Sequence, residues 1–351
     1  MKAQSALVLA FLLLSQPTAG TGDRIAFSCV PERKDDAELY LILGDGTGLQ
    51  RLTYNAVAEL SPVWSPDGER LVFQSAYWYQ PTNVDVVVSM NILDVSVLVP
   101  QVIIDGHRSS PTWSPDGQWI AFVTGPLESP PLSILKIRQD GSQPTSIIQG
   151  MEAANLAWSP DGAWIAFVSG GYRIFRIRPD GTELKEITQS DSLILSLKWA
   201  PDSHEIAYQT LSALHVTDTE GIADHVVVSN LSRGYTWSSE GDLAYVTSSP
   251  VGQILSFIDH QGSVHTVLNN HSGEISWPMW SSNSRHIYYL QSNVGANSQD
   301  ETHVQLHRID TNGSNTVQVT DLDCGVSTPS LSAFRALLGQ TDGPVPSPPD
   351  D

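Results

Sequence analysis

The sequence predicts an all-β protein, a seven-bladed β-propeller of four-stranded antiparallel blades. Three observations predict this fold: a repeat centred on Trp-Ser-Pro-Asp-Gly, a second hairpin turn within most repeats, and two incomplete repeats at the ends that complement each other. A repeat period of roughly 40–45 residues is typical of four-stranded propeller blades. A ring of six blades is the alternative.

Six segments carry the repeat, and three of them keep the Trp-Ser-Pro-Asp-Gly motif intact. Subtracting the numbers of neighbouring repeat tryptophans gives spacings of 49, 45, 41, 38 and 43 residues. We expect these tryptophans to pack between blades, because a large aromatic side chain on a short strand contributes most when it is buried. The predicted structural anchors of the repeat are Trp64, Trp113, Trp158, Trp199, Trp237 and Trp280.

Each repeat contains two hairpins. Ser-Pro-Asp-Gly suits a type I turn, because Pro presets φ at the second position and Gly relieves the last. The run that follows, such as Ile120 to Val123, is apolar on both faces, which favours a strand buried between two sheets. A later Asp-Gly or Asn-Gly pair predicts the outer hairpin. The repeat that begins at Trp64 lacks this pair and has MNILDVSVLVPQVII in its place.

The two ends of the chain predict how the ring closes. The strand of the Ile-Ala-Phe type occurs seven times, and its first copy, Ile25 to Phe27, has no tryptophan strand before it. Ser327 to Ser332 resembles a tryptophan strand with no hairpin after it. We therefore expect the C-terminal strand to complete the first blade. That closure would place Cys29 and Cys324 on one face, so a disulfide is predicted, with two free thiols as the alternative.

These motifs resemble the PD40 (WD40-like) repeats of TolB and related propellers. The resemblance covers essentially the whole mature chain, and it implies the fold rather than a function. TolB carries an additional α/β domain before a propeller usually described as six-bladed. The resemblance therefore implies a stand-alone relative, and it does not imply a Tol-Pal role. Related propellers attached to serine peptidases carry a hydrolase domain, which we do not expect in this chain.

The N-terminal residues predict export. Lys2, the apolar run from Ala6 to Leu14 and small residues near Ala19 are typical of a signal peptide over 1–20, with an uncleaved anchor as the alternative. We expect the propeller over 23–334 and a disordered Pro-rich tail over 335–351. The mature chain should be monomeric, without a membrane span, and located in the periplasm or outside the cell.

The charge and the motifs exclude several classes of function. A net charge of −20 repels phosphate backbones, so we do not expect a nucleic-acid partner. No sequence motif of a hydrolase nucleophile, a phosphate-binding loop or a zinc site is present. His303 and His307 would share a strand face, but no third ligand lies nearby in the sequence. We predict no metal, no cofactor and no catalytic residues.

One face of the ring carries the predicted binding site, since the loops that join blades share a face with those that join second and third strands. Three adjacent aromatics there suit protein or carbohydrate contact, although they could instead cover the blade edge. We expect a non-catalytic scaffold for a protein or carbohydrate ligand. The alternative is a propeller enzyme, a polysaccharide lyase or hydrolase, that uses ionisable residues at the channel mouth. The predicted binding residues are Tyr77, Trp78, Tyr79, His107, Arg108, Tyr172 and Trp277.

Overall fold

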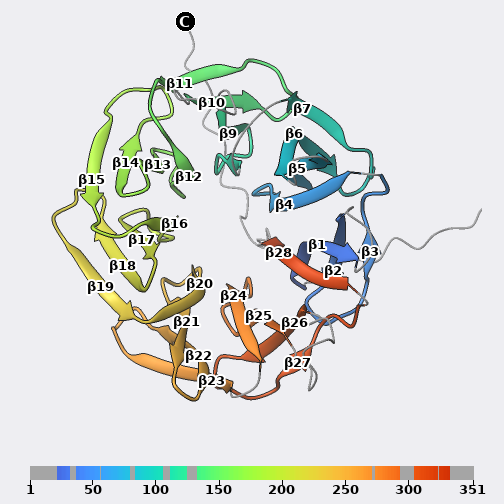
Figure 1. The fold of residues 1–351 in the computed structure, drawn as a ribbon, viewed down its shortest axis with the longest axis vertical. Coiled ribbons are helices and arrows are strands. Elements are labelled where there is room, and N and C mark those ends of the chain that lie inside the picture. Colours follow the sequence, from blue (N-terminus) through green and yellow to red (C-terminus); the bar gives the residue numbers. More distant parts are fainter. Residues whose placement is uncertain are drawn as a thin grey trace, which may run out of the picture.

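Seven antiparallel sheets of four strands each form the molecule, and they stand around a central axis like the blades of a propeller (Figure 1). The computed structural model describes residues 22–31, 37–55, 57–79, 84–105, 111–124, 133–270, 273–292, 304–322 and 324–332. No helix occurs within these ranges. The seven-bladed fold predicted from the repeats is confirmed, and the six-bladed alternative is wrong. The predicted signal peptide and C-terminal tail lie outside the described residues.

The blades follow one another along the chain, and each has one strand beside the channel and three more stacked outwards from it. In that order, blade 1 contains β28 (Cys324–Ser332), β1 (Arg24–Pro31), β2 (Glu38–Leu43) and β3 (Gln50–Arg51). Blade 2 contains β4 (Ala58–Trp64), β5 (Arg70–Tyr79), β6 (Val84–Asp94) and β7 (Gln101–Asp105). Blade 3 contains β8 (Thr112–Trp113), β9 (Trp119–Thr124), β10 (Ser133–Arg138) and β11 (Thr145–Gln149). Blade 4 contains β12 (Ala154–Trp158), β13 (Ile165–Ser169), β14 (Arg173–Ile177) and β15 (Lys185–Gln189).

The remaining three blades repeat the same order. Blade 5 contains β16 (Ile194–Trp199), β17 (Glu205–Thr210), β18 (Ala213–Asp218) and β19 (Asp224–Ser229). Blade 6 contains β20 (Leu231–Trp237), β21 (Leu243–Ser249), β22 (Gly252–Ile258) and β23 (Val264–Asn270). Blade 7 contains β24 (Glu274–Trp280), β25 (His286–Ser292), β26 (Val304–Asp310) and β27 (Val317–Gln318).

The last strand of the chain closes the ring. β28 pairs antiparallel with β1, with Leu331 opposite Ile25, and Figure 1 shows the two strands side by side. The predicted closure of the first blade by the C-terminal strand is confirmed. The same ladder places Cys324 opposite Pro31 and Val326 opposite Cys29, so the two cysteines lie diagonally across neighbouring strands. The disulfide between them stays a prediction.

Indole hydrogen bonds connect the innermost strands around the ring. In each connection the tryptophan Nε1 donates to a carbonyl of the preceding blade, at the residue just before that blade's own tryptophan or its equivalent in β28. Trp158 instead donates to Gly162 in its own turn, at 3.2 Å. The five crossing bonds join Trp64 to Ser330 (3.1 Å), Trp113 to Val63 (3.3 Å), Trp199 to Ala157 (3.0 Å), Trp237 to Lys198 (3.3 Å) and Trp280 to Thr236 (3.2 Å).

The Ser-Pro-Asp-Gly turns satisfy their own carboxylates. In blade 2 the Gly68 N–H donates to the Ser65 carbonyl at 2.9 Å, which closes the turn. Asp67 Oδ1 accepts the Glu69 N–H at 3.0 Å and the Ser65 hydroxyl at 2.5 Å. The same contacts recur around Asp116 and Asp161. These aspartates therefore stabilise turns, as their sequence context indicates.

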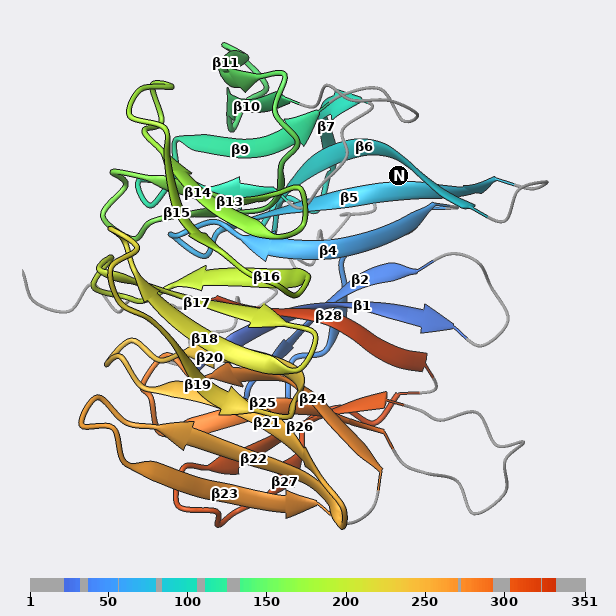
Figure 2. The ribbon, with the colours of Figure 1, turned by 60° about the vertical axis from the view of Figure 1, so that its left-hand side comes forward.

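The hairpin of β5 and β6 is longer than its counterparts and projects from the ring (Figure 2). Its ladder continues through Tyr77 opposite Val86 and Trp78 opposite Asp85 to Tyr79 opposite Val84. The expectation that these three aromatic residues follow the strand in a loop is therefore wrong. The β-branched run that begins at Val84 offers a partner strand with high β propensity, so pairing continues beyond the blade.

Candidate functional site

The innermost strands β4, β8, β12, β16, β20, β24 and β28 surround the central axis of the ring, and we call the region that they enclose the channel (Figure 1). In six blades the residue two positions before the repeat tryptophan is buried, whereas the residue just before the tryptophan is at least partly exposed. Successive side chains of a strand alternate between its faces, so the partly exposed position faces the channel. The residues at this position are Val63, Thr112, Ala157, Lys198, Thr236, Met279 and, in the closing strand, Ser330.

Lys198 is the one charged residue at this channel position. Its Nζ donates to the Tyr235 carbonyl of the next blade at 2.8 Å and lies 5.4 Å from the centroid of the Tyr235 ring. The side chain is exposed, but the protein atoms around the ammonium desolvate it, which lowers the pKa of Lys198 to about 8. No carboxylate among the described residues forms an ion pair with it.

A β-bulge interrupts several innermost strands three residues before the tryptophan. The residue there adopts positive φ, with values of 52° at Ser61, 51° at Asn155 and 94° at Gly234. Trp277 occupies this position in blade 7, with a φ of 52° and 52% of its surface exposed. The left-handed region is unfavourable for a bulky residue, so Trp277 is held there against its own backbone preference.

The predicted binding residues have different outcomes. Tyr172 lies in the turn between β13 and β14 and is exposed, as a binding residue requires. Trp277 lies within innermost strand β24 of blade 7, whereas Tyr172 belongs to blade 4, so the structure does not bring the two together. His107 and Arg108 lie outside the described residues. Only the backbone of Tyr77 to Tyr79 is described, within β5.

Sequence reasoning missed a group of exposed apolar side chains on the same face as Tyr172. Leu193 and Leu195 precede or begin the innermost strand of blade 5, and the backbone N–H of Ile194 donates to the Gly171 carbonyl at 2.8 Å. Leu211 and Val251 lie in the corresponding turns of blades 5 and 6 and are 61% and 68% exposed. We call this group the apolar arc, which comprises Tyr172, Leu193, Leu195, Leu211 and Val251.

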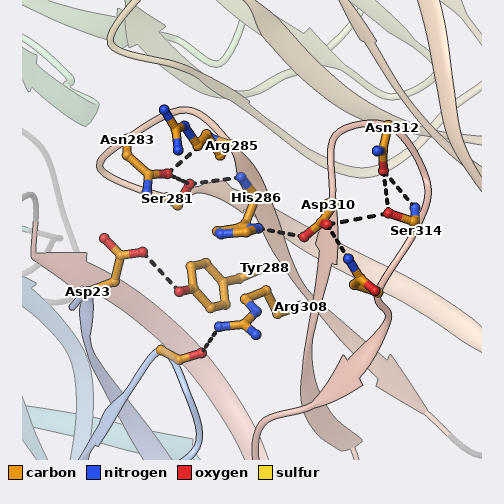
Figure 3. A network of polar contacts seen from close by, with 12 residues as sticks. Asp23, Ser281, Asn283, Arg285, His286, Tyr288, Arg308, Asp310, Asn312 and Ser314 are labelled. Atoms are coloured by element: carbon orange, nitrogen blue, oxygen red, sulfur yellow. Dashed lines mark hydrogen bonds and ion pairs between the residues drawn. The ribbon is translucent and has the colours of Figure 1, made fainter.

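The opposite face has a polar recess of about 350 Å³ where blade 7 meets blade 1 (Figure 3). Tyr288 donates its hydroxyl to Asp23 Oδ2 at 2.9 Å, and the Ser282 N–H donates to Asp23 Oδ1 at 3.0 Å. Arg308 Nη1 donates to the Gly44 carbonyl at 3.0 Å. These contacts connect the first and last blades beside the closing strand.

His286 Nδ1 lies 2.7 Å from Asp310 Oδ1 at the same recess, an arrangement that could orient an imidazole for proton transfer. Desolvation and the nearby Asp23 carboxylate raise the pKa of Tyr288, which keeps its hydroxyl protonated. The hydrogen bond from Asn315 and that from His286 lower the pKa of Asp310. The Ser314 hydroxyl donates to Asp310 Oδ2 at 3.3 Å, so a hydroxyl group lies beside the pair. None of the residues that line the recess belongs to the position just before a repeat tryptophan.

Other histidines pair in the same way on the turns of blade 6. His265 Nε2 lies 2.8 Å from Asp259 Oδ2, and His260 Nδ1 lies 3.5 Å from Asp242 Oδ1. Because these pairs recur on separate turns, a single pair is not by itself a catalytic arrangement. Within the described ranges, no group of three or more His, Cys, Asp or Glu side chains could hold a metal ion. His303 lies outside those ranges, while His307 stacks on the Tyr289 ring, and burial lowers its pKa.

Comparison with known proteins identifies the family. A model of the TolB β-propeller domain family (PD40) matches residues 83–284, more than half of the chain. The chain belongs to the TolB-like PD40 propeller family. No curated protein matches this TolB-like propeller in sequence. In the part of the chain that the structure describes, no helix is long and apolar enough to cross a membrane.

Several solved structures share the fold of this TolB-like propeller. TolB from Acinetobacter baumannii has a TM-score of 0.54 and 18% identity, and the match covers 88% of this chain and 66% of that one, just under two thirds of its length. An oligogalacturonate lyase in complex with manganese has a TM-score of 0.58 and 12% identity, with coverage of 82% and 90%. A putative 6-phosphogluconolactonase from Bacteroides uniformis has a TM-score of 0.57 and 14% identity, with coverage of 86% and 99%. At these identities the likeness shows the fold alone.

Proposed function

We propose that this TolB-like propeller is an exported, non-catalytic scaffold that binds a protein partner on the face that carries the apolar arc. The apolar arc is the observation that carries the proposal. Exposed apolar side chains gathered on one face are unfavourable in water, and a partner that covers them recovers roughly 25 cal/mol for each Å². Other exposed apolar residues, such as Ile222 and Val264, lie on the outer hairpins and outermost strands of separate blades.

The chemistry around the arc supports binding rather than catalysis. Six of the seven residues at the channel-facing position are neutral. An enzyme of the lyase or hydrolase type needs an acid, a base or an ion converging on one place in the channel. Aromatic and aliphatic side chains surrounded by polar groups are the usual composition of a protein-binding surface. A protein partner therefore suits this face better than a polysaccharide substrate.

A catalytic function is the second candidate, because His286, which lines the recess, forms an oriented pair with Asp310. An oligogalacturonate lyase and a putative 6-phosphogluconolactonase have a similar fold, which supports testing these two reactions. A purified sample should be assayed for turnover of oligogalacturonate and of a lactone. Turnover that is abolished by His286→Ala would replace the scaffold proposal with an enzyme.

Site-specific photocrosslinking in the producing cell tests the scaffold proposal. A photoreactive amino acid placed at Leu211 should form an adduct with a partner protein, because this residue lies in the apolar arc. The same amino acid at Ile222 is the matched control, since Ile222 is 85% exposed in the same blade but lies on the opposite face. Val251, on the next blade of the apolar arc, is a second labelling position. Equal adducts at Leu211 and Ile222, or no adduct at either Leu211 or Val251, would contradict the proposal.

Export is a separate part of the proposal. It is supported by the run from Ala6 to Leu14 and by the small residues that follow it. Cell fractionation with N-terminal sequencing of the mature chain tests it. A chain that stays in the cytoplasm with Met1 intact would refute export without affecting the binding face.

A further inference from the structure

The channel contains a cation for which the described residues supply no counter-charge. The equivalent residues in other blades are Val63, Thr112, Ala157, Thr236, Met279 and Ser330, all neutral. Thr occupies the same place in blades 3 and 6, so the repeat itself does not require a cation there. The ammonium is exposed and bonded to one carbonyl, so it can still bind an anion, in a protein whose net charge is −20.

A second departure from the repeat lies beside the first. Trp277 holds an exposed indole at a bulge position that is Ser61, Asn155 and Gly234 in other blades. A bulky residue at a φ of 52° is strained, and such strain persists where it serves a function. A half-exposed indole offers a flat apolar surface on which a ring can stack.

The dipeptide Gly234–Tyr235 connects the two features. Lys198 Nζ donates to the Tyr235 carbonyl, whereas a Cβ added to Gly234 would lie 3.4 Å from the backbone of Trp277. The ammonium of blade 5 therefore contacts one residue of this dipeptide, and the backbone of Trp277 in blade 7 lies beside the other. Because Gly234 has no side chain to separate Lys198 from Trp277, one small molecule can contact both residues.

We propose that the channel binds a small molecule carrying a carboxylate on a six-membered ring, with the carboxylate on Lys198 and one face of the ring on Trp277. This site is distinct from the apolar arc and does not require the protein partner. The ammonium supplies a charge-assisted hydrogen bond to the carboxylate. The ring can be aromatic or a sugar, since an indole stacks on either.

Calorimetric titration of the whole protein with benzoate, galacturonate and benzamide tests the proposal. Benzoate or galacturonate should bind saturably, and which of them binds more tightly identifies the ring as aromatic or sugar. Benzamide has the same ring as benzoate without the charge, so we expect it to bind at least tenfold more weakly. Absence of binding by both acids would overturn the site.

Variants taken from the repeat itself locate the site. Lys198→Thr introduces the residue of blades 3 and 6, and Trp277→Ser introduces the residue that blade 2 has at the same bulge, so both should fold. Each should weaken acid binding at least tenfold, whereas Lys185→Thr on an outermost strand should not change it. Affinity unchanged by Lys198→Thr would refute the proposal.

Protection of the amine in the unmodified protein provides an independent measurement, which remains decisive if a variant fails to fold. Limited acylation followed by peptide mass spectrometry should show that the bound acid protects Lys198 at least fivefold but does not protect Lys185. Equal acylation of Lys198 with and without the acid would exclude contact. Crosslinking through Leu211 should persist in Lys198→Thr, so failure of this site is distinguishable from failure of the protein-binding face.

Discussion

The indole bond across the ring closure should contribute measurably to stability. Trp64 is 7% exposed, and its Nε1 donates to the Ser330 carbonyl of the closing strand at 3.1 Å. Trp64→Phe keeps an aromatic ring in the site but removes the donor. A typical hydrogen bond contributes about 1 kcal/mol net, and an acceptor left without a partner costs about 1–3 kcal/mol. Together with the smaller ring, we expect a loss of about 2 kcal/mol in the free energy of unfolding.

Urea unfolding monitored by circular dichroism measures this loss, and Trp158→Phe is the matched control. Trp158 donates to Gly162 within its own turn, so its replacement removes a local bond and leaves the blade junction intact. We expect a loss of about 1 kcal/mol or less there. Amide exchange in β28 should accelerate in Trp64→Phe alone. Equal losses in the two variants, or unchanged exchange in β28, would refute the idea that the bond secures the closure.

Three further predictions concern turns, a buried acid and the cysteines. Gly221→Ala should lower the free energy of unfolding more than Gly262→Ala does, by at least about 1 kcal/mol in urea unfolding. At Gly221 the new Cβ would collide with a carbonyl of β15, whereas Gly262 has a similar φ and faces open space. Desolvation raises the pKa of Glu59, so its charge opposes folding as pH rises through the unfolded value; Glu59→Gln should flatten that decline in a pH series of melting temperatures. Non-reducing peptide mapping should recover a Cys29–Cys324 cross-link, and recovery of both as alkylated thiols would contradict it.

The blade pattern could be predicted from the sequence because the turns are determined by local hydrogen bonds. Ser-Pro-Asp-Gly specifies its turn through bonds within six residues, as the contacts of Asp67 show, so each copy reports one hairpin without knowledge of the rest. The closure was also predictable, because an unpaired strand at each end has only the other to pair with. Both inferences depend on short-range bonding or simple counting.

The features that define the candidate sites depend on information that a local pattern lacks. How far the β5–β6 ladder extends is set by pairing across the strands, so Tyr77 to Tyr79 were expected in a loop. The exposure of Leu211 and Val251 depends on which face of the ring their turns lie on. Lys198 could have been found by aligning the residue before each repeat tryptophan, where it is the one charged member. The strain at Trp277 arises from a bulge that the sequence does not reveal.

The position of β28 has a consequence for the synthesis of the protein. A chain emerges N-terminus first, so β1 must wait with one edge unpaired until more than 290 further residues have been made. Exposed strand edges invite pairing with other chains, so an incomplete product would aggregate or be degraded rather than persist as a shorter ring. Only a full-length chain can therefore pair the free edge of β1 and close the ring.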